Sequence, residues 1–287
     1  MLIELAPAKV NIVLEVLGKR DDGYHEIRSL VQAIDMYDIL SFEVAEEVSL
    51  ECTESGLQTW DNLVIQAAKL LINATGCQRG VRIKLEKRIP WCSGLGGGSS
   101  DAATTLLALN KLWGLELTIS DLLELAAELG ADVSFFLYNG IALIEGKGEK
   151  VIPLLTSVTD WFVLLMSVLP KMSRKTAQMY SSLDDRHFSH GQFIDKALVA
   201  LSRHKELDPS LFFNAFDSIA FDVFPGLEYY WQRFTEAGAS DVHLVGAGPT
   251  LLAPVSHEAG ARDLCNCLCD QGFEAYSVAT ISSRGIN

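Results

Sequence analysis

The sequence contains no apolar run of about 18 residues free of charge, which is the length that a membrane-spanning helix needs. Residues 1–5 carry no basic stretch ahead of an apolar one, so they lack the form of a secretory signal. We therefore expect no membrane partner and a cytoplasmic protein.

Positive charge is also scarce. The chain has 23 Lys and Arg against 37 Asp and Glu, and its formal net charge is −14. A nucleic-acid partner requires a basic surface that can neutralise the phosphate backbone. The charge balance therefore argues against nucleic acid as a partner, including an RNA-binding module, but is compatible with a small anionic ligand.

The six cysteines lack the spacing of a metal site. Cys265, Cys267 and Cys269 alternate within residues 261–271, which have the pattern of a helix. Residues two apart on a helix point to different faces, so these thiols cannot converge on one ion. Cys52, Cys77 and Cys92 have no partner at ligand spacing. The sequence predicts ordinary thiols and no metal ligated by the protein.

What the sequence does contain is a glycine-rich segment at residues 90–103, with four glycines between Gly94 and Gly98. No Lys follows the last glycine, as a P-loop requires, and the glycine spacing does not match a dinucleotide-binding turn. Glycines leave backbone N–H groups free to converge on an anion. A strand is expected at residues 81–85 and a helix at 101–113, capped by Ser99 or Ser100. This context predicts a phosphate cradle, and the alternative is a turn that only allows close packing.

The length of 287 residues and a hydrophobic content of 49% favour two domains of about 130 to 150 residues that share a cleft. Alternation and helical spacing predict the remaining elements. The expected strands are 2–5, 12–16, 39–44, 48–52, 141–145, 150–154, 161–169, 241–245, 250–255 and 275–281, and the expected helices are 63–72 (capped by Asp61), one opening at Ser120 and ending at Gly130, 192–202, 226–237 and 257–271.

Two further positions are candidates for chemistry. Asp132 stands at the head of the apolar residues 133–137, either as a cap or turn carboxylate or as the base that accepts a proton from an attacking hydroxyl. Tyr24 and His25 lie in the polar turn 18–25, either as part of a surface hairpin or as a pair that stacks on a flat base.

Taken together, residues 6–11 (APAKVN), 22–25 (DGYH), 90–103, 130–133 (GADV) and 245–250 (VGAGPT) resemble, in order and spacing, the GHMP kinase family of small-molecule kinases. The likeness extends over nearly the whole chain. It implies an α+β fold with an N-terminal domain like ribosomal protein S5 (residues 1–155) and a ferredoxin-like C-terminal domain (156–287), with ATP and the acceptor in the cleft between them.

The resemblance also implies roles for individual residues. Asp132 would be the catalytic base and Lys9 the cation that keeps it ionised, in transfer of the ATP γ-phosphoryl group to the 2-hydroxyl of a cytidine-diphosphate-linked sugar alcohol. The ATP-binding positions would be Asn62, Lys87, Pro90, Gly94, Leu95, Gly96, Gly97, Gly98, Ser99 and Ser100. The substrate-binding positions would be Asn11, Tyr24, His25, Thr176 and Tyr180. Mg²⁺ is expected with ATP, held mostly by phosphates and water. The protein would be a monomer or a homodimer.

Some residues depart from the family pattern. Val245 and Ala247 stand where the last motif usually has serines, so only backbone donors remain there. Trp91, at the entrance of the glycine-rich loop, is either a lid over the nucleotide or a core residue. A homoserine or mevalonate type of kinase would not need Tyr24 and His25. A regulatory nucleotide-binding protein without turnover would not need both Lys9 and Asp132.

Overall fold

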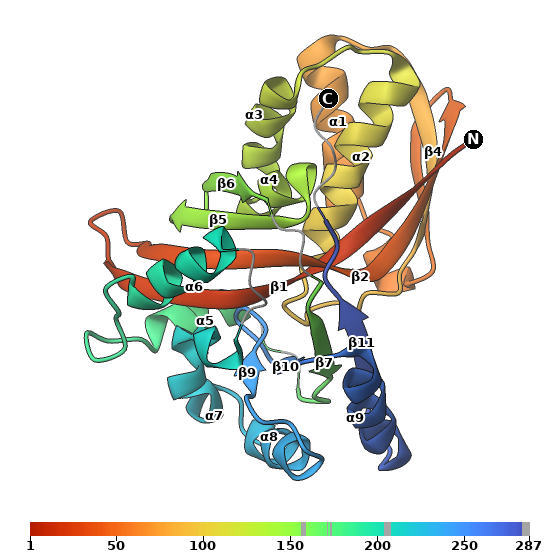
Figure 1. The fold of residues 1–287 in the computed structure, drawn as a ribbon. Helices are drawn as coiled ribbons and strands as arrows, with labels where there is room; N and C mark the ends of the chain where they lie inside the picture. The colour runs from red at the N-terminus through yellow and green to blue at the C-terminus, as the bar shows by residue number, and fades with distance from the viewer. Residues whose placement is uncertain (156–158, 171, 173, 204–207, 283–287) are drawn as a thin grey trace.

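A long two-stranded antiparallel ribbon runs through the molecule and takes part in both of its halves (Figure 1). In this computed structural model, which describes residues 1–155, 159–170, 172, 174–203 and 208–282, the ribbon consists of β1 (Leu2–Lys19) and β2 (His25–Ala45). Its register runs from Leu2 opposite Phe42 to Lys19 opposite His25. The turn between the strands is the polar turn expected from the sequence.

The sequence prediction of two strands at 2–5 and 12–16 is wrong, because β1 is continuous. Residues 6–11 belong to the strand, which shifts register between Pro7 and Ala8 and again between Asn11 and Val13. A proline has no N–H to donate to its neighbour, and a local irregularity accommodates it within a paired strand. The polar Lys9 and Asn11 are therefore held on a strand and not on a loop.

The ribbon is the centre of a seven-stranded sheet with the order β3-β4-β2-β1-β8. The strand β5 pairs with β2 near the hairpin end, and β6 pairs with β5. The bounds of the added strands are Val48–Cys52 (β3), Gly80–Glu86 (β4), Ile141–Gly146 (β5), Lys150–Leu154 (β6) and Phe213–Asn214 (β8). The predicted strands at 48–52 and 81–85 and the hairpin at 141–154 are confirmed, whereas the predicted strand at 39–44 is only the last part of the longer β2.

Helices from the first half pack against this sheet (Figure 1). They are α1 (Leu63–Thr75), α2 (Gly97–Trp113), α3 (Ile119–Leu129) and α4 (Ala131–Tyr138), with a short 3-10 turn at Ser55–Leu57. The predicted caps of α1 and α3 are wrong by one or two residues. Asn62 caps α1 in place of Asp61, and Thr118 forms a capping box with Asp121 in place of Ser120.

The helix α2 begins at Gly97, four residues earlier than predicted, and its N-cap is Gly96 and not Ser99 or Ser100. Gly96 has φ +75° and provides no side-chain cap. The left-handed conformation at Gly96 lets the glycines themselves form the first turn of the helix. Both serines consequently lie inside the helix.

The second half is a four-stranded sheet with the order β11-β7-β10-β9. Its strands are β7 (Trp161–Leu165), β9 (His243–Leu244), β10 (Leu251–Val255) and β11 (Ala275–Ala279), and α9 (Glu258–Asp270) connects β10 to β11. The elements between β7 and β9 are α5 (Lys175–Ser181), α6 (Gln192–Ser202), α7 (Ala220–Val223), α8 (Leu227–Glu236), β8 and the 3-10 turns Pro209–Leu211 and Ala215–Ile219. This strand order, with helices in both connections, is the ferredoxin-like arrangement and confirms the predicted α+β fold.

The hairpin end of the ribbon packs against this second half. Leu14, Val16 and Ile27 share a buried cluster with Val163 and Phe216, whereas the other end of the ribbon packs against α1 and α2. Residues 8–30 of the ribbon therefore lie where the two halves meet. Within the described residues, no helix is both long and apolar enough to cross a membrane.

Candidate active site

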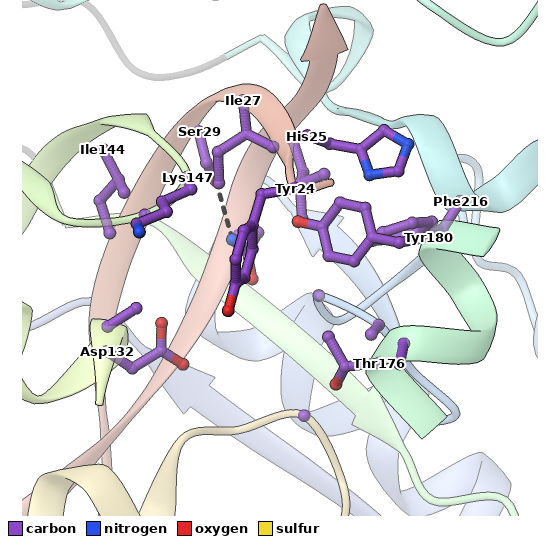
Figure 2. A pocket seen from close by; sticks show the side chains of 18 of the residues that line it. Tyr24, His25, Ile27, Ser29, Asp132, Ile144, Lys147, Thr176, Tyr180 and Phe216 are labelled. Atoms are coloured by element: carbon purple, nitrogen blue, oxygen red, sulfur yellow. Dashed lines mark hydrogen bonds between the residues drawn. The ribbon is translucent and has the colours of Figure 1, made fainter. Parts of the chain in front are cut away.

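A cavity of about 750 Å³ lies beside the ribbon and is also lined by the glycine-rich loop, α4, the β5–β6 turn and α5 (Figure 2). It brings together residues that are far apart in the sequence. The predicted site residues that line it are Lys9, Asn11, Tyr24, His25, Gly94, Ser99, Asp132, Thr176 and Tyr180. Both predicted catalytic residues and all five predicted substrate-binding residues therefore share one cavity.

Lys9 and Asn11 belong to a chain of hydrogen bonds on the ribbon. The Lys9 ammonium donates to Asn11 Oδ1 at 2.8 Å, and Asn11 Nδ2 donates to the Ser29 hydroxyl at 2.8 Å (dashed line in Figure 2). Ser29 in turn donates to the carbonyl of Val13 at 2.8 Å. Because each of these side chains is buried, the chain fixes the direction in which the ammonium points.

Asp132 lies in the first turn of α4, and its Oδ2 is 3.9 Å from Lys9 Nζ. The Asp132 side chain is 45% exposed, while that of Lys9 is 7% exposed. The helix N-terminus and the neighbouring ammonium place positive charge beside this carboxylate. A carboxylate that reaches the cavity can accept a proton from a bound hydroxyl.

The glycine-rich loop needs its glycines for close approach. A Cβ on Gly94, which has φ +96°, would collide with the carbonyl oxygen of Val245. A Cβ on Gly96 would lie 2.9 Å from Phe136 and 3.0 Å from Lys9. The backbone N–H of Lys9 donates to the carbonyl of Leu95 at 2.9 Å, so the loop is fastened directly to β1. The first turn of α2 comes directly after this contact. Its backbone N–H groups have no partner within the helix and point to one place, which is the geometry of an anion site.

Beneath the loop lies a buried cluster of Lys87, Asp38 and Asp101. Lys87 Nζ bonds to Asp38 and, at 2.9 Å, to Asp101 Oδ2. Asp38 Oδ1 also accepts the backbone N–H groups of Arg88 and Ile89. A Cβ on Gly97 would lie 3.1 Å from Lys87 Nζ, so the cluster directly supports the first turn of α2. Burial raises the pKa of Asp101 to about 7, with Lys87 acting in the opposite direction and Asp38 adding to the rise.

This pKa leads to a stability prediction. Folding favours the protonated form of Asp101, so its contribution to stability is complete below about pH 4 and is lost as the pH rises through about 7. The Asp101→Asn variant should therefore gain stability relative to the wild type as the pH rises from 4 to 8, by as much as about 4 kcal/mol. Urea unfolding across this range measures the difference.

The matched control for this experiment is Asp121→Asn. Asp121 is exposed, and hydrogen bonds from Thr118 hold its pKa below the usual value, so its substitution should change the stability in the opposite sense. An Asp101→Asn variant that becomes less stable relative to the wild type as the pH rises would contradict the raised pKa.

The remaining predicted ATP-binding residues lie outside the lining of this cavity. Asn62 caps α1, where its Oδ1 accepts from Val64 N at 2.9 Å. The Lys87 ammonium is buried between two carboxylates, so a role at the adenosine end would involve other atoms of this residue or a rearrangement. Trp91 is 45% exposed, which rules out the alternative of a core residue. The roles of Asn62 and Lys87 stay predictions.

The other end of the cavity is aromatic. The His25 ring stacks on Tyr180, with centroids 5.1 Å apart and planes at 23°, and Tyr180 meets Phe216 edge to face at 5.0 Å. Burial and the charge of Lys19 lower the pKa of His25, which favours its neutral imidazole. Burial also raises the pKa of Tyr180 to about 12. Tyr24 is 59% exposed and lies between this group and Asp132 in Figure 2.

The structure adds residues that the sequence analysis did not single out. Lys147, in the β5–β6 turn, lines the cavity with its ammonium 4.9 Å from the centroid of the Tyr24 ring. The buried Asn214 donates to the carbonyls of Leu244 and Gly246 at 2.8 Å and so holds the turn around Gly246. These are single residues in segments without a motif, so only their contacts identify them.

The sequence matches two family models. The GHMP kinases N terminal domain matches residues 62–140, and the GHMP kinases C terminal model matches residues 196–274. The first match includes the glycine-rich loop and Asp132.

Relatives with an assigned activity extend over the whole chain. The 4-diphosphocytidyl-2-C-methyl-D-erythritol kinase of Dehalococcoides mccartyi is 44% identical over 98% of this chain and 99% of its own, and that of Bacillus cereus is 37% identical over 99% and 98%. A crystal structure of 4-(cytidine 5'-diphospho)-2C-methyl-D-erythritol kinase superposes with a TM-score of 0.82 at 34% identity, covering 97% of this chain and 99% of that chain. The L. major mevalonate kinase, at 15% identity and TM-score 0.75 with 98% and 96% covered, shares the fold.

Proposed function

Because this chain belongs to the GHMP kinase family, we propose that it transfers the γ-phosphoryl group of ATP to the 2-hydroxyl of 4-diphosphocytidyl-2-C-methyl-D-erythritol. The observation that carries the proposal is the single cavity that joins the Lys9–Asp132 pair and the glycine-rich loop to an aromatic group. The product would be an intermediate of the non-mevalonate route to isoprenoid precursors.

In the reaction, the acceptor oxygen forms a bond to the γ-phosphorus while the bond from that phosphorus to the β,γ-bridging oxygen breaks, and ADP leaves. Asp132 takes the proton of the attacking hydroxyl and later gives it to solvent. Lys9 pairs with Asp132 and offsets negative charge on the phosphoryl group in transfer. Asn11 orients both Lys9 and the acceptor. Phosphoryl transfer requires mainly alignment and charge stabilisation, which these residues supply.

ATP would lie with its phosphates along Gly94–Ser100 and the first turn of α2. Mg²⁺ would accompany ATP and neutralise charge on the phosphates. Among the described residues, no three His, Cys, Asp or Glu side chains form a metal-binding group. Ser100 suits a supporting role, since its buried hydroxyl has no hydrogen-bond partner in the described part of the chain. We propose that the phosphates, water and this hydroxyl hold the ion.

The aromatic end of the cavity would receive the cytosine. The ring of Tyr24 can stack on the base, and the neutral His25, held against Tyr180, has one N–H to donate and one nitrogen to accept.

We also place the protein in the cytoplasm, where ATP is available. Its cysteines are unpaired, as is typical of a reducing compartment.

The Tyr24→Ala variant tests the base-binding role. Loss of stacking should raise KM for the cytidine acceptor about 5- to 100-fold, because a base on an aromatic ring is worth about 1–3 kcal/mol. KM for ATP and kcat should stay within about threefold of their wild-type values. Steady-state kinetics with each substrate varied in turn measures this split, and Tyr229→Ala, which removes an exposed ring on α8, is the matched control. An unchanged acceptor KM would remove Tyr24 from the site.

The proposed reaction itself is tested by the identity of its product. With ATP and Mg²⁺, ³¹P NMR should detect one new phosphomonoester on the tertiary 2-hydroxyl, one ADP per product, and an intact cytidine diphosphate group. Phosphorylation of a different hydroxyl, or ADP release without a new phosphomonoester, would contradict the proposal.

A further inference from the structure

Lys175, the first residue of α5, connects the two glycine-containing loops of the site. Its ammonium donates to the carbonyl of Cys92 at 2.9 Å and also to the carbonyl of Gly248. Cys92 lies in the middle of the loop between β4 and α2, and Gly248 lies in the turn between β9 and β10. One side chain therefore bonds to loops from both halves of the molecule.

This ammonium is half-buried and has no matching charge among the described residues. No carboxylate lies within ion-pair distance of Lys175 among the residues that the structure describes. An ammonium has three N–H donors, and its bonds within the described part of the chain, to two carbonyls, use two of them. Burial lowers the pKa of Lys175 to about 8, with Cys92 opposing this effect and the charge of Lys9 adding to it. A half-buried cation in a cavity wall, held by two neutral carbonyls, is stabilised by an anion.

The turn that Lys175 contacts offers no side-chain hydroxyl to a bound phosphate. The turn at residues 245–249 contains Val245 and Ala247, so its side chains supply no hydroxyl. The hydroxyl of Thr250 faces the sulfur of Met166 at 3.8 Å. A Cβ on Gly246 would lie 3.3 Å from Lys9 Nζ, so this turn sits directly on the catalytic lysine. Lys175 bonds to the same turn and lines the same cavity.

We propose that Lys175 is a second phosphate-binding ammonium of this site, which holds the two glycine loops together and donates its third N–H to a phosphate oxygen. The inference rests on the proposed kinase function, which brings two sources of phosphate to the cavity. One is ATP, and the other is the diphosphate of the cytidine acceptor.

Kinetics of Lys175→Met test the contact, because methionine keeps the length of the side chain and removes the charge. We expect kcat/KM to fall about 10²- to 10³-fold, the range seen when one donor to a reacting oxyanion is removed. The substrate whose KM rises identifies the source of the phosphate. Lys175→Arg should restore a large part of the rate, whereas the exposed Lys111→Met on α2 should resemble the wild type. A Lys175→Met enzyme within twofold of the wild type would overturn the proposal.

A pH profile separates this contact from a structural role. The titratable groups around Lys175 are Lys9 on β1, Cys92 in the loop, Asp132 on α4 and Tyr180 on α5. If the Lys175 charge is required, kcat/KM should fall above about pH 8 in the wild type and fall less in Lys175→Arg, since arginine stays protonated. If kcat/KM falls equally at alkaline pH in the wild type and in Lys175→Arg, the proposal is contradicted.

Proton uptake on binding provides a test without turnover. At pH 8 about half of the Lys175 side chains are neutral, so a phosphate that bonds to the ammonium should draw in up to about half a proton. Calorimetric titrations with MgADP and with CDP, each in two buffers of different ionisation enthalpy, measure this number. The uptake should be absent in Lys175→Met, and equal uptake in both proteins with both ligands would overturn the proposal. Because these titrations involve no acceptor alcohol, they remain decisive for Lys175 even if the proposed kinase reaction fails.

Discussion

The Asp132→Asn variant is expected to lose about 10²- to 10⁴-fold in kcat, because asparagine cannot accept the proton of the attacking hydroxyl. Asn has nearly the same size as Asp, and the Asp132 side chain is 45% exposed, so the fold should be retained. Affinity for ATP and for the acceptor should change by no more than about threefold. Single-turnover kinetics with both substrates bound measures the chemical step directly.

The exposed Asp185→Asn is the matched control, since it removes a carboxylate that does not line the cavity. An Asp132→Asn enzyme that keeps its rate within tenfold would exclude Asp132 as the base. The Lys9–Asp132 pair would then serve only to position other groups.

The Lys9→Met variant should also lose about 10²- to 10³-fold in kcat, because it removes the ammonium 3.9 Å from Asp132 Oδ2. Methionine fills much of the same buried space, so a loss of activity reports the charge and not a cavity. It also leaves Asn11 Oδ1 without the donor at 2.8 Å, which should raise KM for the acceptor modestly. Steady-state kinetics and thermal unfolding separate these effects.

The double variant Lys9→Met, Asp132→Asn distinguishes a coupled pair from two independent groups. If Lys9 acts largely through Asp132, the combined loss should be far smaller than the product of the single losses. Fully multiplicative losses would show that Lys9 acts on the phosphoryl group alone.

Much of this site could be predicted from the sequence because its parts are local. The strand before the glycine-rich loop and the helix after it follow from patterns within about 30 residues, and the turn at Tyr24 and His25 follows from its polar, glycine-flanked composition. The predictions of the helix caps were wrong where a neighbouring residue could cap the helix equally well. The glycines at 96–98 can enter a helix or precede it, and only the contacts of Gly96 with Lys9 and Phe136 decide.

Contacts between distant segments could not be predicted in this way. Lys87 bonds to Asp38 from 49 residues away, and Lys175 bonds to Cys92 from 83 residues away. Neither pair lies in one helix or strand, so no periodicity reports it. The resemblance to a family placed Lys9 and Asp132 in one site, and the structure supplies the distance between them. The role of a half-buried cation such as Lys175 becomes visible only when its hydrogen-bond partners are known.

The central claim is that the cavity selects a cytidine-linked alcohol and phosphorylates it. The most direct measurement is ADP release by the purified protein with ATP and Mg²⁺, comparing 4-diphosphocytidyl-2-C-methyl-D-erythritol with homoserine and mevalonate. We expect turnover with the cytidine compound alone, since only this acceptor uses both the Lys9–Asp132 pair and the aromatic end of the cavity. Turnover with homoserine or mevalonate, or ADP release with none of the three, would contradict the assignment.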